Sequence, residues 1–270
     1  MIVDRPLIDR LDRTAAQLVL EMADGYQRVE PAGPAAARSF GQGALVALGP
    51  GRWVNRSIGI PPPDDQATFD ELEGFFVRAG VPPSFEVDTW ASSSALRGLA
   101  TRGFSVEWFR ELFVAEPGVR TEEATTAVSV HAVGPGRVDD WIEVFSKAFA
   151  GDVPSEQGVA ELHARAMEST PSTTHFVATV GSEVVGCGSL SVIDGIAWLG
   201  GTATLPAHRG RGVQTALLRH RLQLASDAGC DIAAATAMPG GPSGRNLRRS
   251  GFTLVAVQAV MTRPLTRGPS

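Results

Sequence analysis

Residues 206–218 read PAHRGRGVQTALL, and this stretch decides the fold because it joins an apolar strand to an apolar helix. The preceding residues 196–205 alternate as a strand that Pro206 ends, and 212–228 have the apolar spacing of a helix. The first turn of a helix leaves its N–H groups unpaired and carries partial positive charge, so it binds phosphate. Gly210 and Gly212 permit positive φ and a close approach of the backbone, and Arg209 and Arg211 add charge. The stretch therefore predicts a pyrophosphate site.

Other phosphate-binding motifs do not fit this stretch. A P-loop requires a lysine after its second glycine, and this stretch contains no lysine. A dinucleotide fingerprint would need a third glycine at position 215, where the chain has threonine. An RGRG segment that binds RNA normally lies in low-complexity sequence, not between a strand and a helix. A plain glycine-rich turn is the alternative interpretation.

The second half of the chain predicts a mixed α/β sheet with helices on both faces. The strand–helix–strand unit over 196–237 is expected to be a right-handed parallel crossover. Around it the residue patterns predict helices over 137–150, 155–167 and 242–250, a hairpin of strands 174–180 and 183–192, and a last strand over 252–263.

The first half resembles a weakened copy of the second. At an offset of 148 residues, Arg97 matches Arg245, Leu99 matches Leu247, and Gly103-Phe104 matches Gly251-Phe252. Where the second half has RGRG, the first has IPPPDD (60–65), whose prolines lack amide donors and whose aspartates repel phosphate. The predicted domains are 1–116, without the anion motif, a linker over 117–124, and 125–270. Further elements expected in the first half are helices 6–23 and 68–79, strands 44–48 and 53–60 as a hairpin, and a strand 85–88.

The pattern Arg209-x-x-Gly212-x-Gln214, after TATLP and before TALL, resembles the acyl-CoA motif of the GNAT acetyltransferase superfamily. The order of elements from 137 to 263 is similar too, and the duplicated layout resembles tandem GNAT proteins. The resemblance implies two GNAT-like domains and acetyl-CoA as cosubstrate. It also implies backbone hydrogen bonds from Thr202, Ala203 and Thr204 to the pantetheine arm. The pyrophosphate would be held by Arg209, Gly210, Arg211, Gly212, Val213, Gln214 and Thr215, with Asn246 facing the donor.

The sequence departs from the family pattern at three positions. Gln214 replaces a small residue, and its side chain either points outward or narrows the phosphate site. Trp198 stands where some members carry a glutamate base, and Leu247 stands where many carry a tyrosine acid. The only tyrosine of the chain is Tyr26. Ser243 is then the candidate proton donor to the leaving thiolate, a weak one, and proximity supplies much of the rate.

Acceptor residues are suggested only by position. Asp152 and Glu156 lie where the family's first helix–helix loop lines the acceptor site, and Trp198 faces the same region. Solvated surface acids are the plainer interpretation of the first two. His175 and His208 are interpreted as a structural residue and a solvated flank, and the sequence contains no metal-ligand spacing.

Composition limits the classes of partner. No run approaches the ~18 apolar residues that span a bilayer, no signal peptide is evident, and two lone cysteines, Cys187 and Cys230, fit a reducing compartment. We therefore expect a cytoplasmic protein. Residues 201–270 carry a net charge of +7 and the rest −12, which indicates a discrete anionic ligand and not a nucleic-acid or membrane surface. The function predicted is N-acetylation of a small-molecule amine, with a CoA-binding module of little turnover as the alternative. The sequence makes no prediction of oligomeric state.

Overall fold

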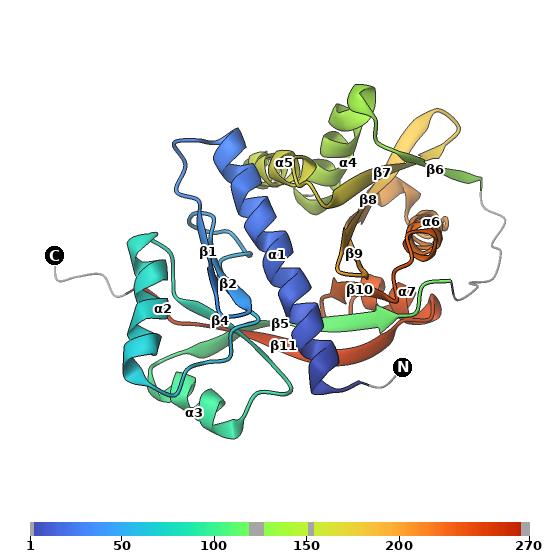
Figure 1. Cartoon of the computed structure of the whole chain (residues 1–270). Coiled ribbons are helices and arrows are strands. Elements are labelled where there is room, and N and C mark those ends of the chain that lie inside the picture. The colour runs from blue at the N-terminus through green and yellow to red at the C-terminus, as the bar shows by residue number, and fades with distance from the viewer. Residues whose placement is uncertain (1–2, 119–126, 151–153, 266–270) are drawn as a thin grey trace. The chain divides into compact units, whose positions relative to one another are not determined.

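The computed structural model describes residues 3–118, 127–150 and 154–265, and these form two compact units (Figure 1). The first unit comprises residues 1–111 and 255–270, and the second comprises residues 112–254. The structure thus has the mixed α/β character that the sequence predicts. The compact units differ from the predicted domains 1–116 and 125–270 because the last strand lies in the first unit. The predicted linker 117–124 lies mostly outside the described residues.

The sheet of the first unit has the strand order β1-β2-β3-β4-β11. The strands β1, β2 and β3 are antiparallel neighbours, β3 and β4 are parallel, and β11 is antiparallel to β4. The helix α2 and the strand β4 share a core of phenylalanines on one face of this sheet, and α1 packs on β1, β2 and β3. The elements are α1 Arg5–Val29, β1 Ala36–Phe40, β2 Gly43–Ala47, β3 Arg56–Ile58, α2 Gln66–Arg78, β4 Ser84–Asp88, α3 Ser93–Thr101 and β11 Thr253–Thr262.

The strand β5, Ser105–Ala115, runs from the first unit into the second. Within the second unit the strand order is β10-β9-β8-β7-β6, in which β10 and β9 are parallel and the other neighbours are antiparallel. The parallel β9–α6–β10 crossover is the one predicted. Its strands are β6 Val128–Ala132, β7 Thr173–Val180, β8 Glu183–Ile193, β9 Ile196–Thr204 and β10 Ile232–Ala237, and its helices are α4 Val138–Ala150, α5 Pro154–Glu168, α6 Val213–Asp227 and α7 Pro242–Arg249.

Helices cover both faces of the sheet in the second unit (Figure 1). Leu217, Leu218 and Leu222 of α6 pack on one face with Ala197 and Leu199 of β9. On the other face, the α4 side chains of Trp141, Phe145 and neighbours pack with Val177 and Cys187. Because side chains alternate along a strand, this two-sided core requires strands that are apolar on both faces.

Glycines allow α6 to approach the sheet closely. A Cβ atom at Gly186 of β8 would lie 2.5 Å from the Cγ1 atom of Val213, the first residue of α6. At Gly188 it would lie 3.0 Å from the guanidinium carbon of Arg221. A side chain at Gly186 would push the start of α6 away from β8, whereas one at Gly188 would displace the guanidinium of Arg221.

Candidate functional site

The N-terminus of α6 is a helix end that no described side chain caps. Gly212 is the N-cap residue with φ of 80°, and no described side chain caps the helix. The amides of the first turn therefore lack the partner that a serine or aspartate cap would supply. Gly210 has φ of 76°, and a Cβ atom there would meet nothing within 4 Å. Both glycines have the positive φ that the sequence predicts, in a turn that exposes its backbone.

The two arginines of this turn are exposed. Arg209 follows a short 3₁₀ turn, Pro206–His208, and its Nε atom donates to the carbonyl oxygen of Thr204 at 3.4 Å. Arg211 lies one residue before the N-cap and is also exposed. Exposed guanidinium groups beside an uncapped helix add positive charge where an anion would bind.

The strands β9 and β10 separate next to this turn. Their parallel ladder ends at the pair Leu199–Ala235, and beyond it only Gly200, Ala203 and Thr204 of β9 have register partners, all on β8. A bulge in the β8–β9 ladder lies at Gly201, whose φ is 56°, and Thr202. Thr202, Ala203 and Thr204, predicted to bind pantetheine, are half-buried residues in this separated segment.

Gln214 links α6 to α7. Its amide nitrogen donates to the hydroxyl of Ser243 at 3.2 Å, and its amide oxygen accepts from the side-chain nitrogen of Asn246. The side chain lies along the helices and therefore does not point outward from the site. The structure thus brings together three predicted residues, Gln214, Ser243 and Asn246, beside the first turn of α6, where Val213 is buried and Thr215 is half-buried.

The positions where the family's base and acid would stand carry no titratable group. Trp198 is half-buried on β9, on the face opposite Ala197 and Leu199. Leu247 is 2% exposed and belongs to the core of the second unit. Tyr26 is buried in α1, in the first unit. Neither Trp198 nor Leu247 supplies a general base or acid within the second unit.

His175 is structural, as the sequence analysis interprets it. Its Nδ1 atom lies 2.8 Å from the Ser189 hydroxyl and its Nε2 atom lies 3.1 Å from the carbonyl oxygen of Met167. A carbonyl only accepts, so Nε2 carries the hydrogen and Nδ1 accepts from Ser189. Burial lowers the pKa of His175 to about 4, and the ring lies against Trp141 at a centroid distance of 4.2 Å, tilted by 51°.

The interpretation of His208 as a solvated flank is wrong. His208 is 9% exposed, and its Nε2 atom lies 3.1 Å from a carboxylate oxygen of Glu183. The preceding Pro206 begins a 3₁₀ turn that folds the ring inward. The sequence offers no local signal for this contact because Glu183 lies 25 residues earlier.

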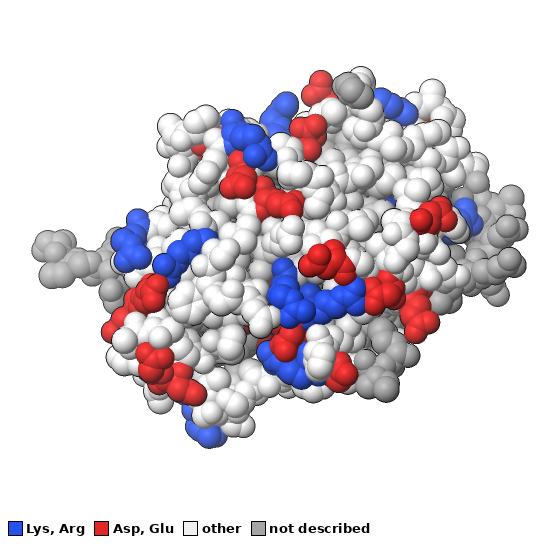
Figure 2. All heavy atoms as spheres, viewed as in Figure 1, with Lys and Arg blue, Asp and Glu red and all other residues white. Residues whose placement is uncertain are grey.

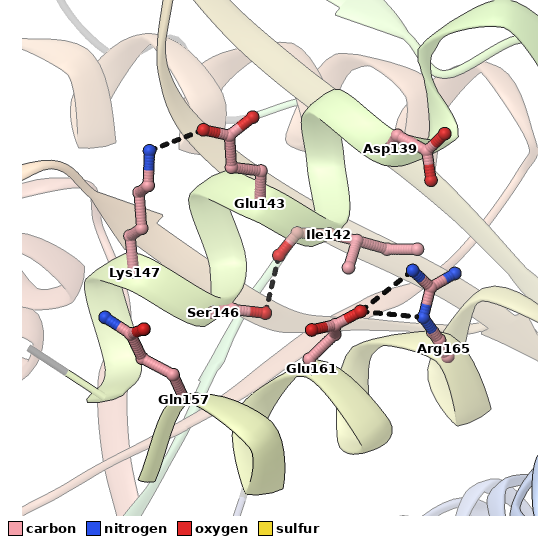
Figure 3. A pocket seen from close by; sticks show the side chains of 8 residues that line it. All are labelled: Asp139, Ile142, Glu143, Ser146, Lys147, Gln157, Glu161 and Arg165. Carbon is pink, nitrogen blue, oxygen red and sulfur yellow. Dashed lines mark hydrogen bonds and ion pairs between the residues drawn. The ribbon is translucent and has the colours of Figure 1, made fainter. Parts of the chain in front are cut away.

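Glu156 is exposed on α5, and Asp152 lies outside the described residues. The solvent-facing sides of α4 and α5 form a hollow of about 300 Å³, shown in Figure 3. Its basic side chains turn to glutamates of their own helices, Lys147 to Glu143 and Arg165 to Glu161. Such exposed pairs contribute little to stability, and the hollow includes no residue of β9, α6 or α7.

The corresponding turn of the first unit is closed to anions. There α2 follows Pro61–Pro63, and its N-cap Asp65 accepts a hydrogen bond from the Thr68 amide at 2.8 Å. This backbone hydrogen bond lowers the pKa of Asp65, so the carboxylate occupies the place that a phosphate would take. A cavity also lies in this unit, lined by IPPPD (60–64) and by acids that no sequence motif marks as a site.

Most of the second unit matches a known protein family. Residues 138–252 match the model of the acetyltransferase (GNAT) family. No curated protein matches the chain.

Solved structures resemble the whole chain. A GCN5-related N-acetyltransferase from Kribbella flavida is 18% identical, with 96% of each chain covered and a TM-score of 0.66. A functionally unknown conserved protein from Staphylococcus epidermidis is 15% identical, covering 82% of this chain and 90% of that chain at a TM-score of 0.63. A tandem GNAT protein from the clavulanic acid biosynthesis pathway is 14% identical, covering 100% of this chain and 98% of its own at a TM-score of 0.60. Residues 138–252 therefore form a domain of the acetyltransferase (GNAT) family, and the chain shares the fold of a tandem GNAT protein.

Proposed function

We propose that the second unit binds acetyl-CoA and transfers its acetyl group to the amine of a small molecule. The uncapped N-terminus of α6, with Gly210 and Gly212 at positive φ, is the observation that carries this proposal. A pyrophosphate there would accept hydrogen bonds from the amides of the first turn, with Arg209 and Arg211 beside it. The separated end of β9 offers backbone groups of Thr202, Ala203 and Thr204 to an extended arm, and Asn246 of α7 is bonded to Gln214 in the first turn of α6.

The reaction proposed is direct attack of a neutral amine on the thioester carbonyl. The new C–N bond forms as the C–S bond breaks, the amine nitrogen loses one proton and the thiolate gains one. Positioning supplies most of the acceleration, because Trp198 and Leu247 stand where a base and an acid are otherwise found. Water takes the amine proton, and the Ser243 hydroxyl, which accepts from Gln214, keeps its own hydrogen free to donate toward sulfur. We propose that the amine acceptor binds near Glu156, Asp152 and Trp198.

No helix of the described residues is long and apolar enough to cross a bilayer. On the face shown in Figure 2, acidic and basic side chains are intermixed, with no broad basic area of the type that binds nucleic acids. Both cysteines are buried thiols outside any disulfide. These observations support a small-molecule acceptor and the cytoplasm as the proposed compartment.

The replacement Gly212→Val tests the acetyl-CoA site. A β-branched residue is strained at a φ of 80°, at a cost of about 1–3 kcal/mol, and its side chain would block the approach of pyrophosphate. We expect acetyl-CoA binding in calorimetry to fall at least a hundredfold while the far-UV circular dichroism spectrum stays unchanged. Gly229→Val, at a φ of 72° beyond the far end of α6, is the matched control for strain. Equal affinity of the Gly212 variant and the control would refute the proposal.

The alternative is a CoA-binding module with little turnover, suggested by the missing base and acid. Release of free thiol from acetyl-CoA in the presence of a panel of amines distinguishes the two. Amine-dependent thiol release above the uncatalysed rate supports the enzyme, and tight acetyl-CoA binding without release supports the module.

A further inference from the structure

The first unit contains a cavity of about 550 Å³ lined only by its own residues. It lies where the parallel strands β3 and β4, which share the single register pair Ser57–Phe85, reach their carboxyl ends. Ligands of open α/β sheets bind in the crevice outside such strand ends, and ligand pockets of this size are common. The position is the one that the anion site occupies in the second unit, between the equivalent strands and the turn before the following helix.

The cavity has a buried polar floor whose geometry is fixed. Glu86 and Gln258 line it and are 7% and 3% exposed. One oxygen of Glu86 accepts from Arg110 at 2.8 Å and from Gln258 at 3.1 Å, and the other accepts from Arg56 at 2.7 Å. Arg110 also donates to the amide oxygen of Gln258 at 2.8 Å. Burial alone would raise the pKa of Glu86, but Arg110 and Arg56 lower it below its usual value, so the carboxylate stays ionised.

Three aspartates also line the cavity. Asp12, Asp64 and Asp88 face the cavity, and its one lining cation, Arg5, is paired with Asp9 at 2.7 Å. Among the described residues no hydrogen bond reaches the Asp12 carboxyl, although Asp12 is mostly buried. Burial, followed by the charges of Glu86 and Asp88, raises the pKa of Asp12 to about 7. A bound cation would relieve this repulsion.

The remaining wall is apolar. Pro61–Pro63 form one side of it, and Trp90, which is 42% exposed, forms another. An indole ring and prolines provide contact surface for a hydrocarbon or aromatic body, and indole faces attract cations. The lining thus combines negatively charged side chains at the floor of the cavity with apolar surface around them.

We propose that the first unit binds a small organic cation, a primary amine carrying an apolar body, in the cavity between β3, β4 and the turn 60–64. The reason is that equivalent positions of the two units carry opposite charges. The second unit has an uncapped helix end beside two arginines. The first unit has three aspartates and a helix end that Asp65 caps. The ammonium lies beside Asp12, and the apolar body contacts the prolines and Trp90.

Calorimetric titration of the full chain without acetyl-CoA tests this proposal independently of the transferase activity. The probes are phenethylamine, its neutral analogue 2-phenylethanol and its anionic analogue phenylacetate, at about pH 8.5. There the Asp12 carboxyl, with a pKa of about 7, is ionised and an alkylamine is still protonated. We expect phenethylamine to bind at least tenfold more tightly than either analogue. Equal binding of the three probes, or no binding of the amine, would overturn the proposal.

Two pairs of variants locate the site. Asp12→Asn should weaken phenethylamine at least tenfold, about 1.4 kcal/mol, whereas Asp70→Asn on the exposed side of α2 should not. Ala95→Phe fills the cavity from α3, and Ala100→Phe places the same ring on the exposed side of that helix. Loss of binding in Asp12→Asn and Ala95→Phe alone supports the proposal. Binding unchanged in both of these variants would place the amine elsewhere and refute it.

Discussion

Gln214 shows how one side chain connects the first turn of α6 to α7. Its hydrogen bonds to Ser243 and Asn246 orient both residues toward the first turn of α6. A hydroxyl with an ordinary pKa is a poor proton donor, so Ser243→Ala should lower kcat by no more than roughly tenfold, about 1.4 kcal/mol. Steady-state rates with acetyl-CoA at saturation measure this change. A thousandfold loss with unchanged acetyl-CoA affinity would identify Ser243 as the general acid.

Two buried titratable residues make opposite contributions to stability at acid pH. His175 has its pKa lowered to about 4, so between pH 6.5 and 4 the unfolded chain binds a proton that the folded chain does not. Stability therefore falls as the pH falls through this window, by at most about 3 kcal/mol. Asp12 has its pKa raised to about 7, so the folded chain binds the extra proton and stability rises over a similar window.

Single replacements separate these two contributions. Between pH 7 and pH 4.5, His175→Gln should lose less unfolding free energy than the wild-type chain, and Asp12→Asn should lose more. Urea denaturation at the two pH values measures the differences. Parallel pH profiles for all three chains would contradict the assignment of a neutral His175 and a protonatable Asp12.

At the scale of elements, the sequence predicts the helices and strands whose bounds are set by local patterns. The helices α6 and α7 and the strands β7–β10 lie within two residues of their predicted bounds, because turns such as Gly181-Ser182 and apolar periodicity define them. The strand β1 was not predicted, since AARSF has no apolar alternation, and α1 extends six residues beyond the predicted end at residue 23. The edge strand β6, VSVHA, alternates but is short and was also missed.

Local sequence patterns could not predict contacts between residues that are distant in the chain. Nothing near residues 253–262 indicates that β11 pairs with β4 of the first unit, and nothing near Glu86 indicates its two arginine partners. The helix cap at Asp65 was predicted only in part. The aspartates of IPPPDD predicted that the first half repels phosphate, and the structure adds that one of them closes the helix end.

Arg221 supports the bulge of β9 from α6. It is 0% exposed, and one terminal nitrogen donates to the carbonyls of Ser189 at 2.9 Å and Gly200 at 3.2 Å. Burial lowers its pKa to about 10. Arg221→Met would leave those carbonyls without this donor, so we expect a loss of about 2 kcal/mol or more in unfolding free energy and weaker acetyl-CoA binding.

The control for Arg221→Met is Arg219→Met, at a half-buried position on the same helix. Thermal denaturation and calorimetry with acetyl-CoA measure the two effects. If both variants matched the wild-type chain in stability and affinity, the bulge would not depend on the guanidinium.

At the scale of the whole molecule, the two halves repeat local geometry at the offset seen in the sequence. Gly103 and Gly251 have φ of 83° and 86°, and each ends a helix through the same pair of hydrogen bonds. The amides of Phe104 and Phe252 both donate at 3.1 Å to the carbonyls of Leu99 and Leu247. This is the Schellman arrangement, and its repetition after 148 residues supports an internal duplication in which Arg110 and Gln258, bonded to each other, occupy equivalent positions.

The duplicated halves should nevertheless bind one acetyl-CoA per chain. In the second unit the first turn of α6 is uncapped and flanked by Arg209 and Arg211, whereas Asp65 caps the equivalent helix α2 after three prolines. An anion at α2 would have to displace a carboxylate and would meet fewer free amides, since proline has none. Calorimetric titration should therefore give a stoichiometry of one, and Gly212→Val should remove that single binding event without revealing another. Two equivalents in the wild-type chain, or one equivalent retained by Gly212→Val, would place an acetyl-CoA site in the first unit, and the closed helix end at Asp65 would not exclude phosphate after all.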